Sequence, residues 1–233
     1  KYKSKSCKAL ELSKLFNCKY TNNWKKIFDE DIDAVILSTP TKLFNKIGSE
    51  ILNRKKHLLV EKPLGRNINE AKNLTKLAIK NKVLLKTGFN LRFDTGIMKA
   101  QKYIIDNKIG NKIYFIKMSY VNGTVLTNNN NVGSLLDIGV HSINLAQFFL
   151  NTNTFDNYTK INQVNESKNR DDNGFLILKK NNTIVSIHHS FVNWQNSFKI
   201  EIFGEKGFIN IESLPKWGTQ KFTFGKRVFP SGK

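Results

Sequence analysis

The sequence predicts an α/β protein that begins with a partial doubly wound parallel sheet and continues into an α+β domain with a large, mostly antiparallel open sheet. Short branched apolar runs alternate with helix-like segments in the first part, and two of those runs end at a proline. From Phe175 onward, strand-like runs follow one another with turn signals between them. We expect the first domain over 1–92 and the second over 93–233.

The first domain should alternate helices with buried strands. We expect a helix over 4–17, a short helix capped by Asn22 that runs to Phe28, a strand over 33–39, a helix with the apolar stripe Leu43, Phe44, Ile47, Ile51 and Leu52, a strand over 57–60, a helix with the stripe Ala71, Leu74, Leu77 and Ala78, and a strand over 83–89. Asn67 and Glu70 resemble a capping box at the start of the third long helix.

Two charged residues close the strand over 57–60. Glu61 and Lys62 precede Pro63, which fixes φ and ends the strand. Ligands of open α/β sheets bind beyond the carboxyl ends of the strands, which is where these two side chains should lie. On this stretch alone, an exposed charged turn remains an open alternative.

The second domain should combine two helices with a sheet. We expect a helix over 94–107, a strand over 112–120, a loop over 128–131, an apolar helix over 134–150, and strands over 175–180, 183–191, 197–204, 207–213 and 221–226. The turn signals between several of these runs predict antiparallel hairpins.

The helix over 134–150 carries one polar stripe in an otherwise apolar surface. At ~100° per residue, Asp137, His141 and Asn144 fall within about 60° of one another. A buried carboxylate or imidazole requires a partner or a cleft, so we expect the stripe to face a site. A structural Asp–His pair and a general base oriented by its neighbour both fit this pattern.

Composition disfavours nucleic acid and membranes as partners. The net charge is +20, yet only five of the 38 basic residues are Arg, whereas base and phosphate recognition favours clustered Arg. No apolar run reaches the ~18 residues that a membrane span needs. Cys7 and Cys18 stand alone, which suits a reducing, cytoplasmic compartment. We expect no metal, because His188 and His189 should point to opposite faces of a strand.

Five stretches in this order resemble the Gfo/Idh/MocA family of NAD(P)-dependent oxidoreductases, related to glucose-fructose oxidoreductase and inositol dehydrogenase. They are Asp31–Pro40, Val60–Leu64, Thr87–Asp94, Leu136–His141 and Ile202–Gly207. The Glu-Lys-Pro of the second and the Asp-x-x-x-His of the fourth are the specific part. The resemblance implies that the parallel sheet belongs to a Rossmann domain, that NAD or NADP is the cofactor, and that the substrate is a sugar, a cyclitol or a derivative.

The resemblance also implies roles for single residues. Lys62, Asp137 and His141 match the catalytic positions, and Arg92 matches a position that often contacts substrate, beside which we place Asn144. The positions that match the lining of the dinucleotide site are Ser38, Thr39, Pro40, Leu43, Glu61 and Lys62. His141 would take the hydroxyl proton as hydride leaves the same carbon, with Asp137 orienting the ring and Lys62 bonding the reacting oxygen.

The sequence departs from the family at two places. It has no GxGxxG loop, so the choice between NAD and NADP cannot be read from it, and Phe44 stands where many members have His. We interpret the chain as an internal fragment that is inactive alone. The alternatives are a redox-inactive assembly or sugar-binding relative and an NAD-dependent glycoside-cleaving enzyme. Relatives often assemble through the open sheet of the second domain, so we expect a homo-oligomer.

Overall fold

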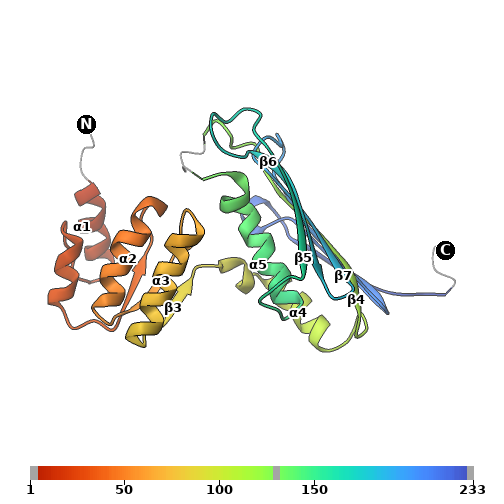
Figure 1. The fold of residues 1–233 in the computed structure, drawn as a ribbon, viewed down its shortest axis with the longest axis horizontal. Helices are drawn as coiled ribbons and strands as arrows, with labels where there is room; N and C mark the ends of the chain where they lie inside the picture. The colour runs from red at the N-terminus through yellow and green to blue at the C-terminus, as the bar shows by residue number, and fades with distance from the viewer. Residues whose placement is uncertain (1–4, 128–131, 230–233) are drawn as a thin grey trace.

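The computed structural model describes residues 5–127 and 132–229, and its first part is a small parallel sheet (Figure 1). The three strands β1 (Ala34–Leu37), β2 (His57–Val60) and β3 (Leu85–Thr87) lie in the order β1-β2-β3. Both neighbouring pairs are parallel. The alternation of strand and helix in the sequence therefore gave the correct topology, because a parallel neighbour requires a crossover helix.

Helices pack on this sheet through the apolar stripes that the sequence predicts. The helical elements of this part are α1 (Lys5–Leu15), η1 (Trp24–Asp29), η2 (Thr41–Leu43), α2 (Phe44–Asn53) and α3 (Ile68–Asn81). The two longest stripes, from α2 and α3, meet strand β2 in one core. Phe44, Ile51 and Leu74 are at most 1% exposed there. Position 44 is thus an interior packing position.

The predicted capping box at α3 forms with one partner changed. Asn67 Oδ1 accepts a hydrogen bond from the Glu70 backbone N–H at 3.0 Å, as a capping box requires. Glu70 returns its bond to the N–H of Arg66, at 2.8 Å, one residue before the expected donor. The Arg66 guanidinium also hydrogen-bonds Glu70 and holds the pKa of that carboxyl below its usual value. The residue pattern therefore marked the start of the helix correctly.

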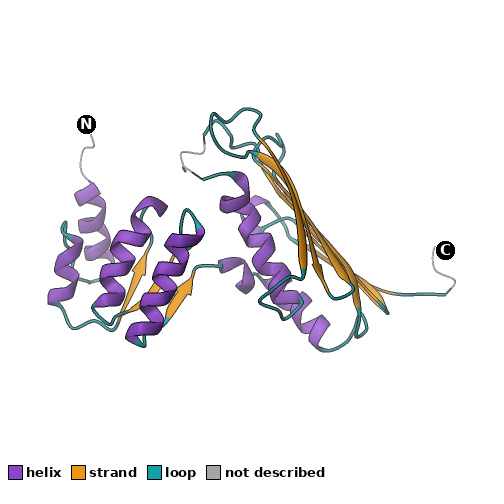
Figure 2. Cartoon of the chain, viewed as in Figure 1, coloured by secondary structure: helices purple, strands orange, loops and turns teal. Residues whose placement is uncertain are grey.

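The second part of the chain is a seven-stranded sheet with helices on one face (Figure 2). Its helical elements are η3 (Asn90–Phe93), α4 (Thr95–Ile105), η4 (Leu135–Gly139), α5 (Val140–Phe149) and η5 (Pro215–Trp217). Its strands are β4 (Ile113–Val121), β5 (Asn157–Gln163), β6 (Asn173–Lys180), β7 (Thr183–Ser190), β8 (Ser197–Gly204), β9 (Gly207–Glu212) and β10 (Lys221–Lys226). The order is β10-β9-β8-β4-β7-β6-β5. Among the described strands of this sheet, only β4 and β7 pair in parallel.

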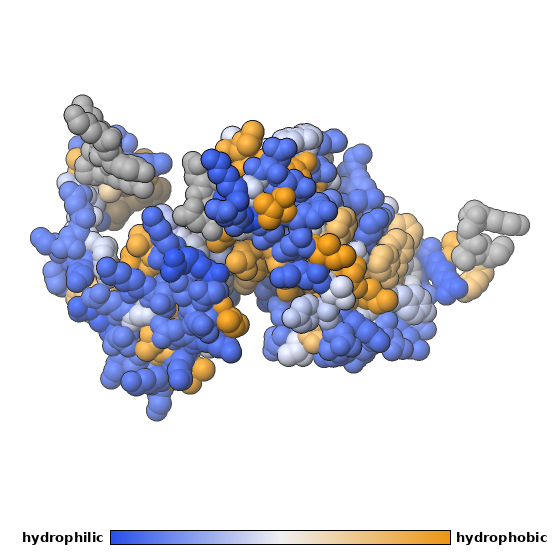
Figure 3. Space-filling model, turned by 45° about the horizontal axis from the view of Figure 1, so that its top comes forward, coloured by the Kyte–Doolittle hydropathy of each residue, from blue (hydrophilic) through white to orange (hydrophobic). Residues whose placement is uncertain are grey.

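The core of this part lies between the sheet and the helices that cover it. Alternate residues of the strands point inward, among them Ile116, Ile187 and Ile202, each 0% exposed. Figure 2 shows α4 and α5 along one face, while the opposite face carries no helix. Hydrophobic side chains gather over this larger part of the surface in Figure 3, whereas the smaller part is mostly hydrophilic. None of the helices in the described ranges is long and apolar enough to cross a bilayer.

The structure differs from the sequence analysis at three places. The second helix is a 3₁₀ helix whose N-cap is Asn23, not Asn22, because the Asn23 side chain accepts from the Lys25 N–H. The helix over 134–150 begins with five residues of π-helix, η4, before α5. The edge strand β5 was not expected, because most of its side chains are exposed and give no apolar alternation. The loop over 128–131 lies outside the described residues.

Candidate active site

Lys62 and Asp137 bring the two parts of the molecule together at the end of β2. Lys62 follows the strand, and its peptide bond to Pro63 is cis. The Lys62 Nζ atom lies 2.5 Å from Asp137 Oδ1 and donates a second hydrogen bond, of 2.6 Å, to the backbone carbonyl of Asp137. Asp137 belongs to the π-helical turn η4. A lysine at the mouth of the parallel sheet therefore holds the turn at which the apolar helix begins.

The Lys62–Asp137 ion pair is largely shielded from water. The two side chains are 20% and 13% exposed, respectively. Shielding strengthens the attraction between the charges, but it also makes either charge costly when its partner is removed, by roughly 3–5 kcal/mol for a buried pair. The pair is consequently a fixed feature of the site, unlike the exposed ion pair of Lys19 and Glu30.

His141 lies beside this pair and faces a cavity. The imidazole is 7% exposed, and it lines a cavity of about 350 Å³ together with Lys62, Tyr120 and Lys216. The rings of Phe89 and Tyr120 lie 6.0 and 6.1 Å from the His141 ring, centroid to centroid. Within the described residues, His141 Nδ1 is buried and has no hydrogen-bond partner. The ring is therefore held mainly by packing.

The surroundings keep His141 neutral. The pKa of His141 is lowered to about 4, mainly by burial and then by the positive charges of Lys62 and Lys216, while the Asp137 carboxylate acts in the opposite direction. A neutral imidazole at pH 7 can accept a proton, which is what a general base requires. The Asp137 carboxylate accepts a hydrogen bond from Lys62, and it raises the pKa of His141 as a charge.

Arg92 and Asn144 are brought together, but in a neighbouring cavity. Arg92 Nε donates a hydrogen bond of 2.7 Å to Asn144 Oδ1, and the guanidinium carbon lies 5.2 Å from the centroid of the Phe148 ring. Both residues line a cavity of about 820 Å³ that shares Glu61 and Asn90 with the His141 cavity. Burial lowers the pKa of Arg92. The predicted stripe therefore divides, with His141 facing one cavity and Asn144 the other.

The residues expected to line the dinucleotide lie at the carboxyl ends of β1 and β2. Ser38, Thr39 and Pro40 follow β1, and Glu61 follows β2. The hydroxyl of Thr39 is buried and has no hydrogen-bond partner among the described residues. A buried orphan hydroxyl at this edge fits a polar group of a bound ligand. Leu43 packs partly into the core, so less of its side chain is available to a ligand.

Tyr120 and Lys216 are among the residues of the His141 cavity that sequence reasoning missed. Tyr120 lies near the end of β4, 5% exposed, and its inward position could have been read from the alternation of that strand. Lys216 lies in η5 and donates a hydrogen bond of 3.2 Å to the Tyr120 hydroxyl. Nothing near Lys216 in the sequence distinguishes it from the other lysines. Its place in the site depends on the long-range pairing of the sheet.

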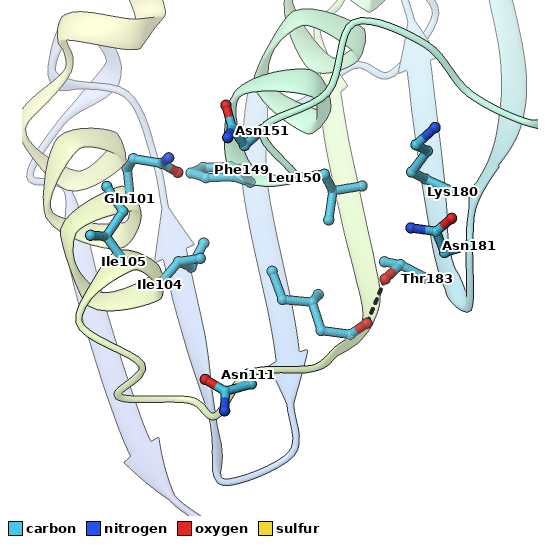
Figure 4. A pocket seen from close by; sticks show the side chains of 11 residues that line it. Gln101, Ile104, Ile105, Asn111, Phe149, Leu150, Asn151, Lys180, Asn181 and Thr183 are labelled. Atoms are coloured by element: carbon cyan, nitrogen blue, oxygen red, sulfur yellow. Dashed lines mark hydrogen bonds between the residues drawn. The ribbon is translucent and has the colours of Figure 1, made fainter.

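A further cavity of about 440 Å³ lies near the end of α5 and the β6–β7 turn (Figure 4). Gln101, Asn111, Asn151 and Asn181 supply its polar groups, and the Thr183 hydroxyl donates to the Ile113 carbonyl at its edge. Its one cation, Lys180, is paired with Asp156. With no acid or base free to act, this cavity is a poor candidate for chemistry.

Two family models match most of the chain. The oxidoreductase family model GFO_IDH_MocA, described as an NAD-binding Rossmann fold, matches residues 2–89. The GFO/IDH/MocA C-terminal domain matches residues 97–210. The two models match the two parts of the fold in the order that the sequence predicts.

Individual proteins agree with these models. The inositol 2-dehydrogenase/D-chiro-inositol 3-dehydrogenase of Lacticaseibacillus casei is 27% identical over 85% of this chain and 58% of its own length. The glucose-6-phosphate 3-dehydrogenase of Bacillus subtilis is 26% identical over 76% of this chain and 57% of its own length. The chain thus spans less than two thirds of these curated relatives.

A solved structure shares the fold. An inositol dehydrogenase homologue from Azotobacter vinelandii, complexed with NADH and myo-inositol, superposes with a TM-score of 0.77 at 17% identity, covering 96% of this chain and 66% of that one. The likeness extends over both sheets of this chain. The two family models, which together match both parts of the fold, show that the chain belongs to the Gfo/Idh/MocA family of oxidoreductases.

Proposed function

We propose that the protein containing this chain is an NAD(P)-dependent oxidoreductase that moves hydride between a nicotinamide and a secondary alcohol of a sugar, a cyclitol or a sugar derivative. One observation carries the proposal. A cation, a carboxylate and a neutral imidazole, Lys62, Asp137 and His141, meet beside one cavity at the carboxyl end of a parallel sheet. The relatives named above are dehydrogenases of such substrates.

The three groups divide the chemistry between them. The nicotinamide supplies the hydride acceptor when it is bound. His141 accepts the hydroxyl proton, because it is neutral and faces the cavity. Lys62 has three N–H groups, and two of them are directed at Asp137, which leaves one for the substrate oxygen. Asp137 fixes the ammonium in place and favours the positive charge that forms on His141.

We assign cofactor binding to 1–92 and substrate binding to 93–233. The edge of the small sheet, with Ser38, Thr39, Pro40, Leu43 and Glu61, lines the dinucleotide in this assignment, and Lys62 lies where both sites meet. The orphan Thr39 hydroxyl supports it. Arg92 and Asn144 face the substrate from the adjoining cavity.

We also propose a cytoplasmic homo-oligomer that forms through the open face of the large sheet. Phe175, Ile177, Ile184 and Phe203 point away from the helices and are 46%, 40%, 47% and 37% exposed. An exposed apolar face of this kind favours a partner. Cys18 is a free, exposed thiol, which suits a reducing compartment.

The test is a titration of NAD and of NADP into the full-length protein, followed by absorbance of the reduced nicotinamide against a panel of polyols and sugars. Binding with turnover on any member supports the proposal. Binding with cleavage of a glycoside and no net reduction of cofactor would favour the glycoside-cleaving alternative. Failure to bind either dinucleotide would contradict the proposal and favour an assembly or sugar-binding role.

A further inference from the structure

We infer that Ser134, Asp171 and His189 form a buried anchor that positions the π-helical turn bearing Asp137, and thereby sets the geometry of the catalytic groups. The inference rests on the proposed function, since it concerns the same reaction. None of these three residues lines the His141 cavity. Ser134 and His189 are both 0% exposed. They are positioning residues that act through the turn.

The hydrogen bonds of the anchor form a chain from His189 through Ser134 to Asp171. The Ser134 hydroxyl donates to Asp171 Oδ2 at 3.0 Å, and because it has a single proton, its oxygen accepts from His189 Nδ1 at 2.9 Å. The Leu135 backbone N–H donates to the same Asp171 oxygen at 2.7 Å. The Ser134 N–H donates to the Asp171 carbonyl at 2.8 Å. A carboxylate thus caps the amino end of the helix, where negative charge is favourable.

His189 holds the other end of the turn by contact. A Cβ atom on Gly139, the last residue of the turn, would lie 3.2 Å from the His189 ring. On the opposite side, a Cβ on Gly174 would lie 2.7 Å from His189 Cε1. The ring is therefore clamped between two glycines, with one nitrogen bound to the start of the turn and one edge against its end. Asp137 lies between these two fixed points.

The segment that carries Asp171 is itself held in place by hydrogen bonds. Asp172, next to Asp171, is 0% exposed and accepts hydrogen bonds from the backbone N–H groups of Asn165, Glu166 and Ser167. Burial alone would raise the pKa of Asp172, but these donors hold it below its usual value. The two adjacent aspartates thus have separate roles, since one holds the loop before β6 and the other holds the turn.

A positioning role follows from what the turn does. π-Helical turns are rare and are found mostly where function requires them. Here the turn directs both the carboxylate and the backbone carbonyl of Asp137 at Lys62 Nζ. Displacement of a reacting group by about 1 Å can cost on the order of 100-fold in rate. An anchor at both ends of the turn prevents such a displacement.

The test compares Ser134→Ala with Ser142→Ala in the full-length protein. Ser142 is also a buried serine of the same helix, 1% exposed, but it lies outside the anchor. We expect Ser134→Ala to lower kcat by roughly 10-fold to 100-fold with KM and the dinucleotide Kd nearly unchanged, and Ser142→Ala to have little effect. Asp171→Asn keeps a carbonyl oxygen for Leu135 and should retain more kcat than Asp171→Ala.

Amide hydrogen exchange provides a measurement that needs no turnover. In Ser134→Ala, the amides of 135–141 should exchange faster while those of β4 and β8 stay as in the wild type. This result would support the anchor even if the wild-type protein reduced no dinucleotide. Failure of the proposed function can therefore be distinguished from failure of this inference. Unchanged exchange over 135–141 would overturn the inference. Acceleration spread evenly over the second domain would also overturn it, because the role would then be general stability.

Discussion

The two buried histidines, His141 on helix α5 and His189 on strand β7, have similar burial and similarly lowered pKa values but differ in their access to a cavity. Burial lowers the pKa of each to about 4. Each has one ring nitrogen without a partner among the described residues. His141, however, borders a cavity next to Lys62, whereas His189 is clamped between two glycines behind the turn. A shifted pKa alone therefore does not identify a catalytic base; the base must also be reachable.

The largest expected effect is the loss of activity when His141 is replaced, compared with replacement of a third histidine, His188. His141→Asn should lower kcat/KM by about 10²-fold to 10⁴-fold, as loss of a general base does. His188→Asn is the matched control, because His188 lies on the outer face of β7, stacked on Phe175 with ring centroids 4.4 Å apart. It should keep wild-type activity. Steady-state kinetics of both variants tests this prediction, with circular dichroism as a check on folding. Full activity of His141→Asn would show that His141 is not the general base.

A smaller loss is expected when the cation beside His141 is removed. Lys62→Met leaves the Asp137 carboxylate shielded and without its ammonium, so we expect kcat to fall by roughly 100-fold and the melting temperature to drop. Lys117→Met removes a lysine that is 60% exposed and pairs with Glu201 at 3.8 Å, and should change neither quantity much.

A double variant shows whether Lys62 and Asp137 act as a unit. The losses of Lys62→Met and Asp137→Asn in kcat/KM should be strongly non-additive in the double variant, because each single change already breaks the pair. Additive losses would show that the two side chains act separately. The matched pair Lys117→Met and Glu201→Gln should show little coupling.

The surroundings of His141 and His189 show what the sequence could and could not predict. The family resemblance placed Lys62, Asp137 and His141 in one site, and the structure brings these three side chains together beside one cavity. Their catalytic roles stay a prediction. The π-turn was not found, since its cause lies in residues distant along the chain, with Asp171 and His189 holding Ser134 and Gly139. Period-3.6 reasoning assumed a regular helix there. The π-turn changes the angular offset of Asp137 from His141, whereas His141 and Asn144 both belong to the regular helix α5 and line neighbouring cavities.

The β-rich half was predictable for a related reason. Interior strands of the sheet such as β4 alternate between buried and more exposed residues, so the sequence pattern predicts them. The turn signals predict the hairpins around β6 and β9. The edge strand β5 buries so little that no pattern survives. The Lys216 side chain joined the site only because β9 and η5 bring it over Tyr120.

Removal of Lys216 should shift a pH profile with a modest change in maximal rate. Its positive charge is the smallest of the causes that act on the pKa of His141, so in Lys216→Met that pKa should rise only a little above about 4, while burial and Lys62 still keep it low. The acid limb of kcat/KM, which reports the free enzyme, should move to higher pH with it. Lys199→Met, on the outer face of the sheet, should leave the limb in place. An unmoved limb in Lys216→Met would mean that another group controls it.

The smallest effect concerns stability in mild acid. His141 and His189 have native pKa values of about 4 and an ordinary value of 6.5, so between these values the unfolded chain binds more protons than the native protein. Stability therefore rises with pH in this window: the contribution is fully present above about pH 6.5 and is lost as the pH falls toward 4. Urea unfolding of wild type and His141→Asn at pH 7.5 and pH 5 measures it. The variant lacks one of the two histidines and should lose less of its free energy of unfolding over that interval, whereas equal losses would show that His141 is not held neutral by the fold.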